Sequence, residues 1–95
     1  MKTPWGTADN VETIRPGILC VSTSSHGGFF VSDERLTIVR KKFPKFKTFC
    51  GKPNWFEEDC DAVIVVLSFP DFFSNGLVES AQQQYDSGKS YYEKI

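Results

Sequence analysis

The stretch Trp55–Pro70 constrains the fold most, because it joins a group of acids to the longest apolar run of the chain. That run, Ala62–Leu67, is mostly β-branched and on this ground favours a buried strand. Two other features favour a helix: carboxylates precede the run, and apolar side chains recur at helical spacing. The residues of this helical face are Phe56, Cys60, Val63 and Leu67. Because Pro70 ends a helix at the residue before it, we expect a helix over about residues 56–68, covered on most sides.

The remaining chain predicts a small α+β domain. Three short runs have strand character, with Pro16 and Gly17 as a turn between the first two. The predicted strands are Val11–Ile14, Ile18–Thr23 and Gly28–Val31. Ser32 is a good N-cap for a helix to about Arg40, and Leu77–Tyr85 predicts another helix. We expect a single domain over residues 1–95, with an antiparallel sheet of three to four strands packed against two to three helices. Residues 45–49 are expected to form an edge strand or a loop.

The cysteine content indicates a cytoplasmic protein. Three cysteines are an odd number without the density of a disulfide scaffold, so we expect free thiols in a reducing cytosol. The N-terminal residues lack the apolar centre of a secretory signal, and no apolar run approaches the ~20 residues of a membrane-spanning helix. Closely spaced cysteine pairs typical of zinc sites are absent, and we expect neither a metal nor another cofactor.

Charge is distributed unevenly along the chain, although the net charge is only -1. Residues 33–52 carry seven Lys and Arg against two acids, whereas residues 53–95 carry two Lys against eight acids. This asymmetry favours contact with an oppositely charged partner; alternatively, the two segments neutralise each other within the fold. The predicted contact residues are Arg40, Lys41, Lys42, Lys45 and Lys47 on the basic side and Glu57, Glu58 and Asp61 on the acidic side.

The same bases alternate with the aromatic residues Phe43, Phe46 and Phe49. Such a pattern could bind a nucleic-acid backbone while the rings stack on bases. The alternative is that the rings belong to the core and the bases are solvated. The net negative charge of the chain argues against a protein dedicated to nucleic acid.

His26, the single histidine, is a candidate for chemistry or ligand binding. If the fold brings its loop to the acidic block, His26 would share a site with Glu57, Asp59 and Cys60. A Cys–His pair could then act as nucleophile and base. The alternative is an inert Cys60 thiol on the core face of its helix. A small enzyme or ligand-binding domain is therefore a second class of function beside protein binding.

Four separated blocks, in order, resemble one family of small domains of unknown function that phages, plasmids and other bacterial mobile elements encode. The blocks are Thr3-Pro4-Trp5-Gly6; Pro16-Gly17-Ile18 with Val21-Ser22-Thr23; Ser25-His26-Gly27-Gly28 with Ser32 and Glu34-Arg35; and Trp55-Phe56-Glu57-Glu58-Asp59-Cys60-Asp61 leading to Ser68-Phe69-Pro70. The similarity covers roughly residues 3–73. It implies a mobile-element protein inside a bacterial cell, acting as a non-enzymatic inhibitor, for example an anti-CRISPR or anti-restriction protein that binds a host defence protein.

Overall fold

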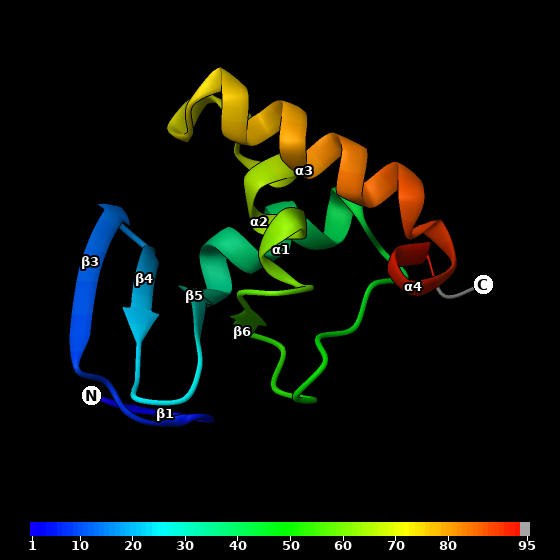
Figure 1. Cartoon of the computed structure of the whole chain (residues 1–95). Coiled ribbons are helices and arrows are strands. Elements are labelled where there is room, and N and C mark those ends of the chain that lie inside the picture. Colours follow the sequence, from blue (N-terminus) through cyan, green and yellow to red (C-terminus); the bar gives the residue numbers. More distant parts are fainter. Residues whose placement is uncertain (94–95) are drawn as a thin grey trace.

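A four-stranded antiparallel sheet with helices on one side forms the body of the protein (Figure 1). The computed structural model describes residues 1–93. The strands lie in the order β3, β4, β5, β6, with bounds Asn10–Arg15, Ile18–Ser22, Gly27–Val31 and Trp55–Glu57. Two shorter strands, β1 (Lys2–Thr3) and β2 (Gly6–Thr7), form a separate hairpin. The α+β prediction, with a small antiparallel sheet packed against helices, is thereby confirmed.

The three N-terminal strands follow the predicted ones closely. β3 and β4 meet at Pro16 and Gly17, where Gly17 adopts a φ of 88° that favours glycine. β5 pairs with β4 from Ile18 opposite Val31 to Ser22 opposite Gly27. Local turn chemistry and alternation were therefore sufficient to predict this meander.

The central stretch differs from its prediction. Residues 55–57 form β6, which pairs with β5, and the helix α2 begins only at Ala62 and runs to Ser68. The acids do not form the first turn of α2: Glu57 ends β6, and the others lie between β6 and α2, in a turn that the Asp61 amide closes by donating to the Glu57 carbonyl at 2.9 Å. The end of the helix before Pro70 and its burial agree with the prediction, since Val63–Val66 are each at most 7% exposed.

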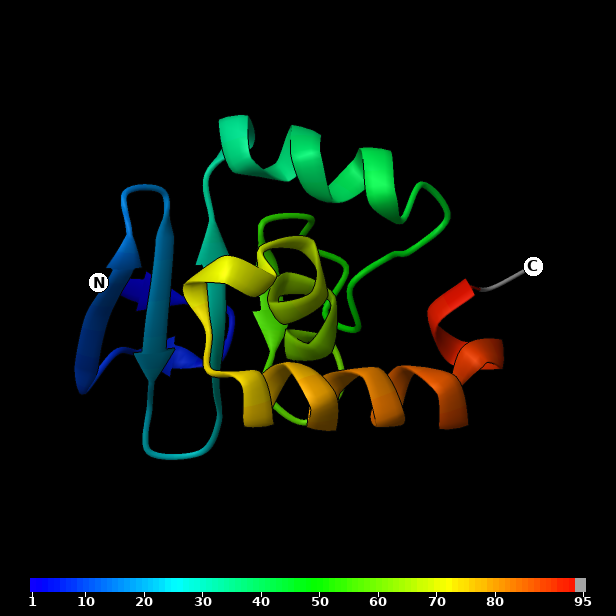
Figure 2. The ribbon, with the colours of Figure 1, turned by 90° about the horizontal axis from the view of Figure 1, so that it is seen from above.

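The helices cover the face of the sheet that carries Ile18, Val31 and Phe56 (Figure 1). α1 (Asp33–Lys42) starts after Ser32, whose hydroxyl accepts a hydrogen bond from the Arg35 amide, as predicted. The C-terminal helices are α3 (Asn75–Ser87) and α4 (Lys89–Glu93), preceded by a short 3-10 turn, η1 (Pro70–Phe72). Figure 2 shows α2 between α1 and α3, which explains why it is the most apolar helix. Residues 43–54, between α1 and β6, form a loop.

The other face of the sheet has a partial cover, the β1–β2 hairpin. Its Trp5 ring meets Trp55 edge to face with centroids 5.8 Å apart, and Trp55 in turn lies 4.9 Å from Phe30. Gly28 lies beneath Trp5, and a Cβ there would come within 2.8 Å of the indole. This close approach holds Trp5 beside the start of β5 and the end of β6, where the candidate site lies.

Within residues 1–93, every helix is too short or too polar to traverse a lipid bilayer.

Candidate functional site

The His26 loop and the acidic block meet at one cavity of about 350 Å³. We call it the acidic cavity; its lining residues are Trp5, His26, Phe49, Cys50, Glu57, Asp59 and Cys60. The structure thus brings together all four residues of the predicted shared site, namely His26, Glu57, Asp59 and Cys60. Sequence reasoning missed Trp5, Phe49 and Cys50, which come from the N-terminal hairpin and from the loop after α1.

Hydrogen bonds of the Thr23 hydroxyl and of the strand backbone fix the loop that carries His26. The Thr23 hydroxyl accepts the His26 amide at 3.1 Å and donates to the His26 carbonyl at 2.7 Å. The following residue, Gly27, accepts the Glu58 amide at 2.9 Å, which joins the loop to the acidic turn. His26 therefore lies at the cavity because the hydrogen bonding between β5 and β6 continues into the turn after β6.

Asp61 is an internal anchor of the fold rather than part of a contact surface. It is 0% exposed, and its carboxylate accepts hydrogen bonds from the Phe49 amide at 2.8 Å, the Glu57 amide at 3.4 Å and the Tyr91 hydroxyl at 2.7 Å. Burial, followed by this bond to Asp61, raises the pKa of Tyr91 above its ordinary value. The predicted acidic contact surface of Glu57, Glu58 and Asp61 is therefore wrong for Asp61, which is fully buried; Glu58 is exposed, and Glu57 is accessible only through the cavity that it lines.

Glu57 has an unusual environment for a carboxylate. It is only 7% exposed and lines the acidic cavity. Its Oε2 accepts the Cys60 amide at 3.2 Å, whereas its Oε1 accepts no hydrogen bond from residues 1–93. No fully buried side-chain oxygen or nitrogen of the described residues lacks a partner, so Oε1 is reachable from outside the protein. The cavity that Glu57 lines provides this access.

The Cys60 thiol lies among carboxylates. Burial, and then the negative charges of Glu57, Asp61 and Asp59, raise its pKa above the ordinary value. Reactive cysteines instead need positive surroundings that stabilise the thiolate. The expected position of Cys60 on the core face of a helix is wrong: the residue lies in the turn before α2 and is half-buried. Charge disfavours nucleophilic chemistry here.

A second candidate surface is basic. Arg40, Lys41 and Lys45 are exposed, and none of them forms an ion pair with another residue of the described chain. Lys42 instead donates to the Ser68 carbonyl at 3.0 Å, at the end of α2. The alternative was that the acids of the chain neutralise these bases. Among the described residues, no acid forms an ion pair with Arg40, Lys41 or Lys45. We call Arg40, Lys41 and Lys45 the basic surface; Lys42 and the exposed Lys47 flank it.

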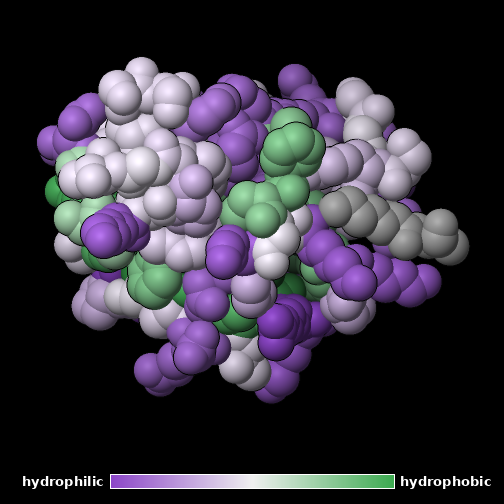
Figure 3. All heavy atoms as spheres, turned by 90° about the horizontal axis from the view of Figure 1, so that it is seen from below, coloured by the Kyte–Doolittle hydropathy of each residue, from purple (hydrophilic) through white to green (hydrophobic). Residues whose placement is uncertain are grey.

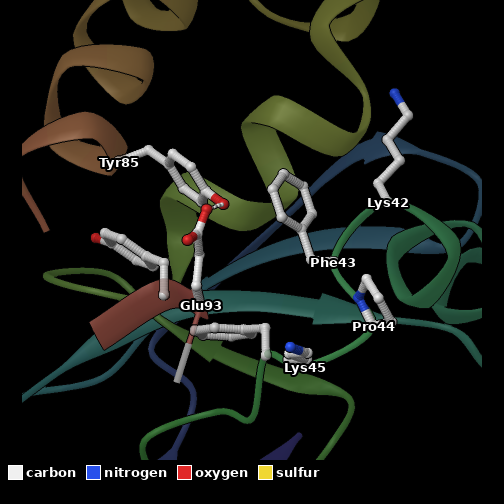
Figure 4. A pocket seen from close by; sticks show the side chains of 8 residues that line it. Lys42, Phe43, Pro44, Lys45, Tyr85 and Glu93 are labelled. Atoms are coloured by element: carbon white, nitrogen blue, oxygen red, sulfur yellow. Dashed lines mark hydrogen bonds between the residues drawn. The ribbon is translucent and has the colours of Figure 1, made fainter. Parts of the chain in front are cut away.

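An aromatic cleft of about 210 Å³ lies beside the basic surface, and Figure 4 shows its side chains. Phe43 packs on Tyr85 with centroids 5.5 Å apart, and Phe46 packs on Tyr92 at 6.1 Å. Tyr85 donates to the Glu93 carboxylate at 3.0 Å, and Lys42 stands at the margin (Figure 4). Because Phe43 and Phe46 pack against the core, they do not form the free stacking platform that nucleic-acid binding would need.

Phe49 differs from these two rings. It is 74% exposed, the largest fraction among the exposed large hydrophobic side chains, and it belongs to the acidic cavity. Figure 3 shows the molecule from below, and on this face hydrophobic atoms emerge in small patches among hydrophilic ones.

A family model described as a domain of unknown function, DUF7007, matches residues 1–95. The chain belongs to the DUF7007 family. This membership agrees with the resemblance to small domains of unknown function, whereas nothing shows that this DUF7007 domain comes from a phage or another mobile element. Neither the comparison with curated proteins nor the comparison with solved structures gives a match.

Among residues 1–93 of the DUF7007 domain, no group of three or more His, Cys, Asp and Glu side chains is placed to hold a metal. The acidic cavity is thus best described by its aromatic walls, its carboxylates and its single imidazole.

Proposed function

We propose that this DUF7007 domain is a non-enzymatic binding protein whose basic surface docks on an acidic region of another protein. The observation that carries the proposal is the absence of an ion pair at Arg40, Lys41 and Lys45 within the described residues. Solvated bases grouped at the end of one helix and the start of the following loop create a local positive field. Such a field accelerates association with an acidic partner and weakens as salt is added.

The proposed partner is a bacterial defence protein, and the proposed effect is its inhibition, as an anti-CRISPR protein would achieve. The resemblance of four sequence blocks to domains that mobile elements encode supports this part. Its support is contextual, because similar sequence blocks alone do not define a mechanism. The cytoplasm of the bacterial host is the corresponding location.

Catalysis is the less favoured function. The cavity contains a histidine and two cysteines, but burial, and then the carboxylates around Cys60, raise the pKa of its thiol. A nucleophilic thiolate at this position would be destabilised by its surroundings.

Affinity capture from a nuclease-treated bacterial lysate tests the main proposal. We expect a captured protein whose association is slowed at least about threefold at low salt by Lys41→Ala/Lys45→Ala. The matched control is Lys2→Ala/Lys52→Ala, which removes the same charge from two other exposed positions and should leave association unchanged. Equal loss in both variants would contradict docking through the basic surface. Binding only to added duplex DNA, with no protein captured, would replace a protein partner by nucleic acid.

The defence proposal needs a cellular readout. The chain is expressed in bacteria that carry an active CRISPR system and a plasmid that the system targets. We expect plasmid transformation to recover with the wild-type chain and less with Lys41→Ala/Lys45→Ala. If transformation stays blocked in cells with CRISPR and also in cells with a restriction system, the defence assignment is wrong, whereas the docking proposal is judged by the capture experiment.

A further inference from the structure

The acidic cavity has the composition of a receptor for a positive charge. Glu57 and Asp59 contribute carboxylates, Trp5 and Phe49 contribute aromatic rings, and the lining contains no lysine or arginine. Aromatic faces attract cations, and the attraction grows when the cation leaves water. A carboxylate beside such rings adds direct charge pairing.

The decisive group is the Glu57 carboxylate. Its side chain is more than nine-tenths buried, yet its Oε1 has no partner within residues 1–93. Because no fully buried side-chain oxygen or nitrogen of the described residues lacks a partner, Oε1 retains access to the cavity and can accept a further hydrogen bond there. A donor that enters the cavity would satisfy this oxygen.

The Trp5 wall of the cavity and the backbone of Phe49 are held in place before any ligand arrives. Trp5 is fixed against Trp55 and Gly28, and its carbonyl accepts a hydrogen bond from the Ser25 hydroxyl at 3.4 Å. On the other side, the Phe49 amide donates to buried Asp61. The Trp5 wall is thus preorganised, which reduces the entropic cost of binding, whereas at Phe49 the backbone is held and the ring is exposed.

We propose that the acidic cavity receives one arginine side chain of a partner protein, with its guanidinium at Glu57 and near the rings of Trp5 and Phe49. Guanidinium is preferred to ammonium because it is planar, stacks on aromatic rings and is more weakly hydrated. This site lies outside the basic surface and uses the opposite charge. The proposal therefore goes beyond the proposed function, and neither depends on the other.

Titration of the isotopically labelled chain with N-acetyl-arginine methylamide, followed by NMR, tests the proposal. We expect saturable shifts of the Trp5 indole and of the amides around Phe49 and Glu57, with a dissociation constant on the order of millimolar for a single side chain. The uncharged citrulline analogue has nearly the same shape and is expected not to saturate. Equal binding of the citrulline probe would overturn the proposal, and equal binding of the lysine analogue would overturn the choice of guanidinium.

Matched variants locate the charge that binds. Glu57→Gln keeps an oxygen for the Cys60 amide and should weaken the arginine probe at least about tenfold, as expected for loss of a charge-assisted hydrogen bond. Glu58→Gln removes the neighbouring carboxylate, which is exposed and outside the cavity lining, and should change binding less than about twofold. The same response in both variants would contradict a specific role for Glu57.

Phe49→Ala keeps the test valid if Glu57→Gln fails to fold. The ring is 74% exposed, so its removal should leave the fold intact. We expect about a two- to fivefold loss of affinity for the arginine probe, as for an exposed cation–π contact. Unchanged affinity in this folded variant would remove Phe49 from the site and overturn the cavity as the receptor.

Discussion

The bases at the end of α1 extend into solvent, whereas two of the four acids before α2 are drawn into the protein. Arg40, Lys41 and Lys45 have no ion-pair partner among the described residues, but Asp61 holds three hydrogen-bond donors and Glu57 one. The two segments carry opposite charge in the sequence, yet all three of these bases are exposed, whereas of the four acids only Glu58 and Asp59 are. Charge along a chain therefore predicts surface charge only where backbone donors do not bind the side chains.

Removal of Asp61 should produce the largest effect, because it tests whether the acidic segment is internal. We expect Asp61→Ala to lower the free energy of unfolding by about 3 kcal/mol or more, since three buried donors lose their acceptor. Chemical denaturation measures the change. Asp59→Asn is the control, because Asp59 is exposed and should alter stability by about 0.5 kcal/mol or less. Similar stability of both variants would remove the distinction between the two segments.

Gly28 tests whether the aromatic wall of the cavity is built into the sheet. In Gly28→Ala the new Cβ would collide with the Phe56 carbonyl and approach the Trp5 indole at 2.8 Å. We expect a loss of about 1–3 kcal/mol and a shift in tryptophan fluorescence as Trp5 moves. Gly76→Ala in α3 meets no atom within 4 Å and should be neutral or stabilising. An unchanged spectrum in folded Gly28→Ala would show that Trp5 is not held there.

The thiol of Cys60 reports both its burial and the negative charge of the cavity, since burial, and then Glu57, Asp61 and Asp59, raise its pKa. Because its pKa is raised, the thiolate fraction at mildly alkaline pH is smaller than that of an ordinary cysteine. In a Cys20→Ser/Cys50→Ser background, we expect labelling by a disulfide reagent to be slower than for a free thiol and to rise only at higher pH. Glu57→Gln should lower the pKa and accelerate labelling. A labelling profile at the ordinary pKa of cysteine would contradict the electrostatic description.

Changes at the basic surface should have the smallest effect on stability. Lys41→Ala/Lys45→Ala removes two solvated charges, and we expect the free energy of unfolding to change by about 0.5 kcal/mol or less. Lys42→Ala is the comparison, because it removes a hydrogen bond to the Ser68 carbonyl and should cost about 1 kcal/mol. Thermal unfolding of both variants decides the point. A larger loss in the double variant would indicate that these bases stabilise the fold itself.

Local signals in the sequence determined much of this architecture. The Pro16–Gly17 turn, the Ser32 cap and the alternation of the first strands each depend on residues a few positions apart. The end of α2 before Pro70 follows from the same kind of local restriction. These features were predictable because the interactions that produce them are short in sequence.

Only the tertiary structure decided the conformation and the burial of the acidic residues before α2. β6 has three residues, too few for a pattern of its own, and it becomes a strand because β5 provides hydrogen bonds from a distant part of the chain. Asp61 is buried because its donors include Phe49 and Tyr91, which precede and follow it by many residues. The sequence predicted that His26 would share a site with Glu57, Asp59 and Cys60 only if the fold brought the two parts together. It could not predict that the fold does so, because the walls of the acidic cavity come from four separate segments. Nonlocal hydrogen bonds and packing bring these segments together, and they leave little trace in the order of the residues.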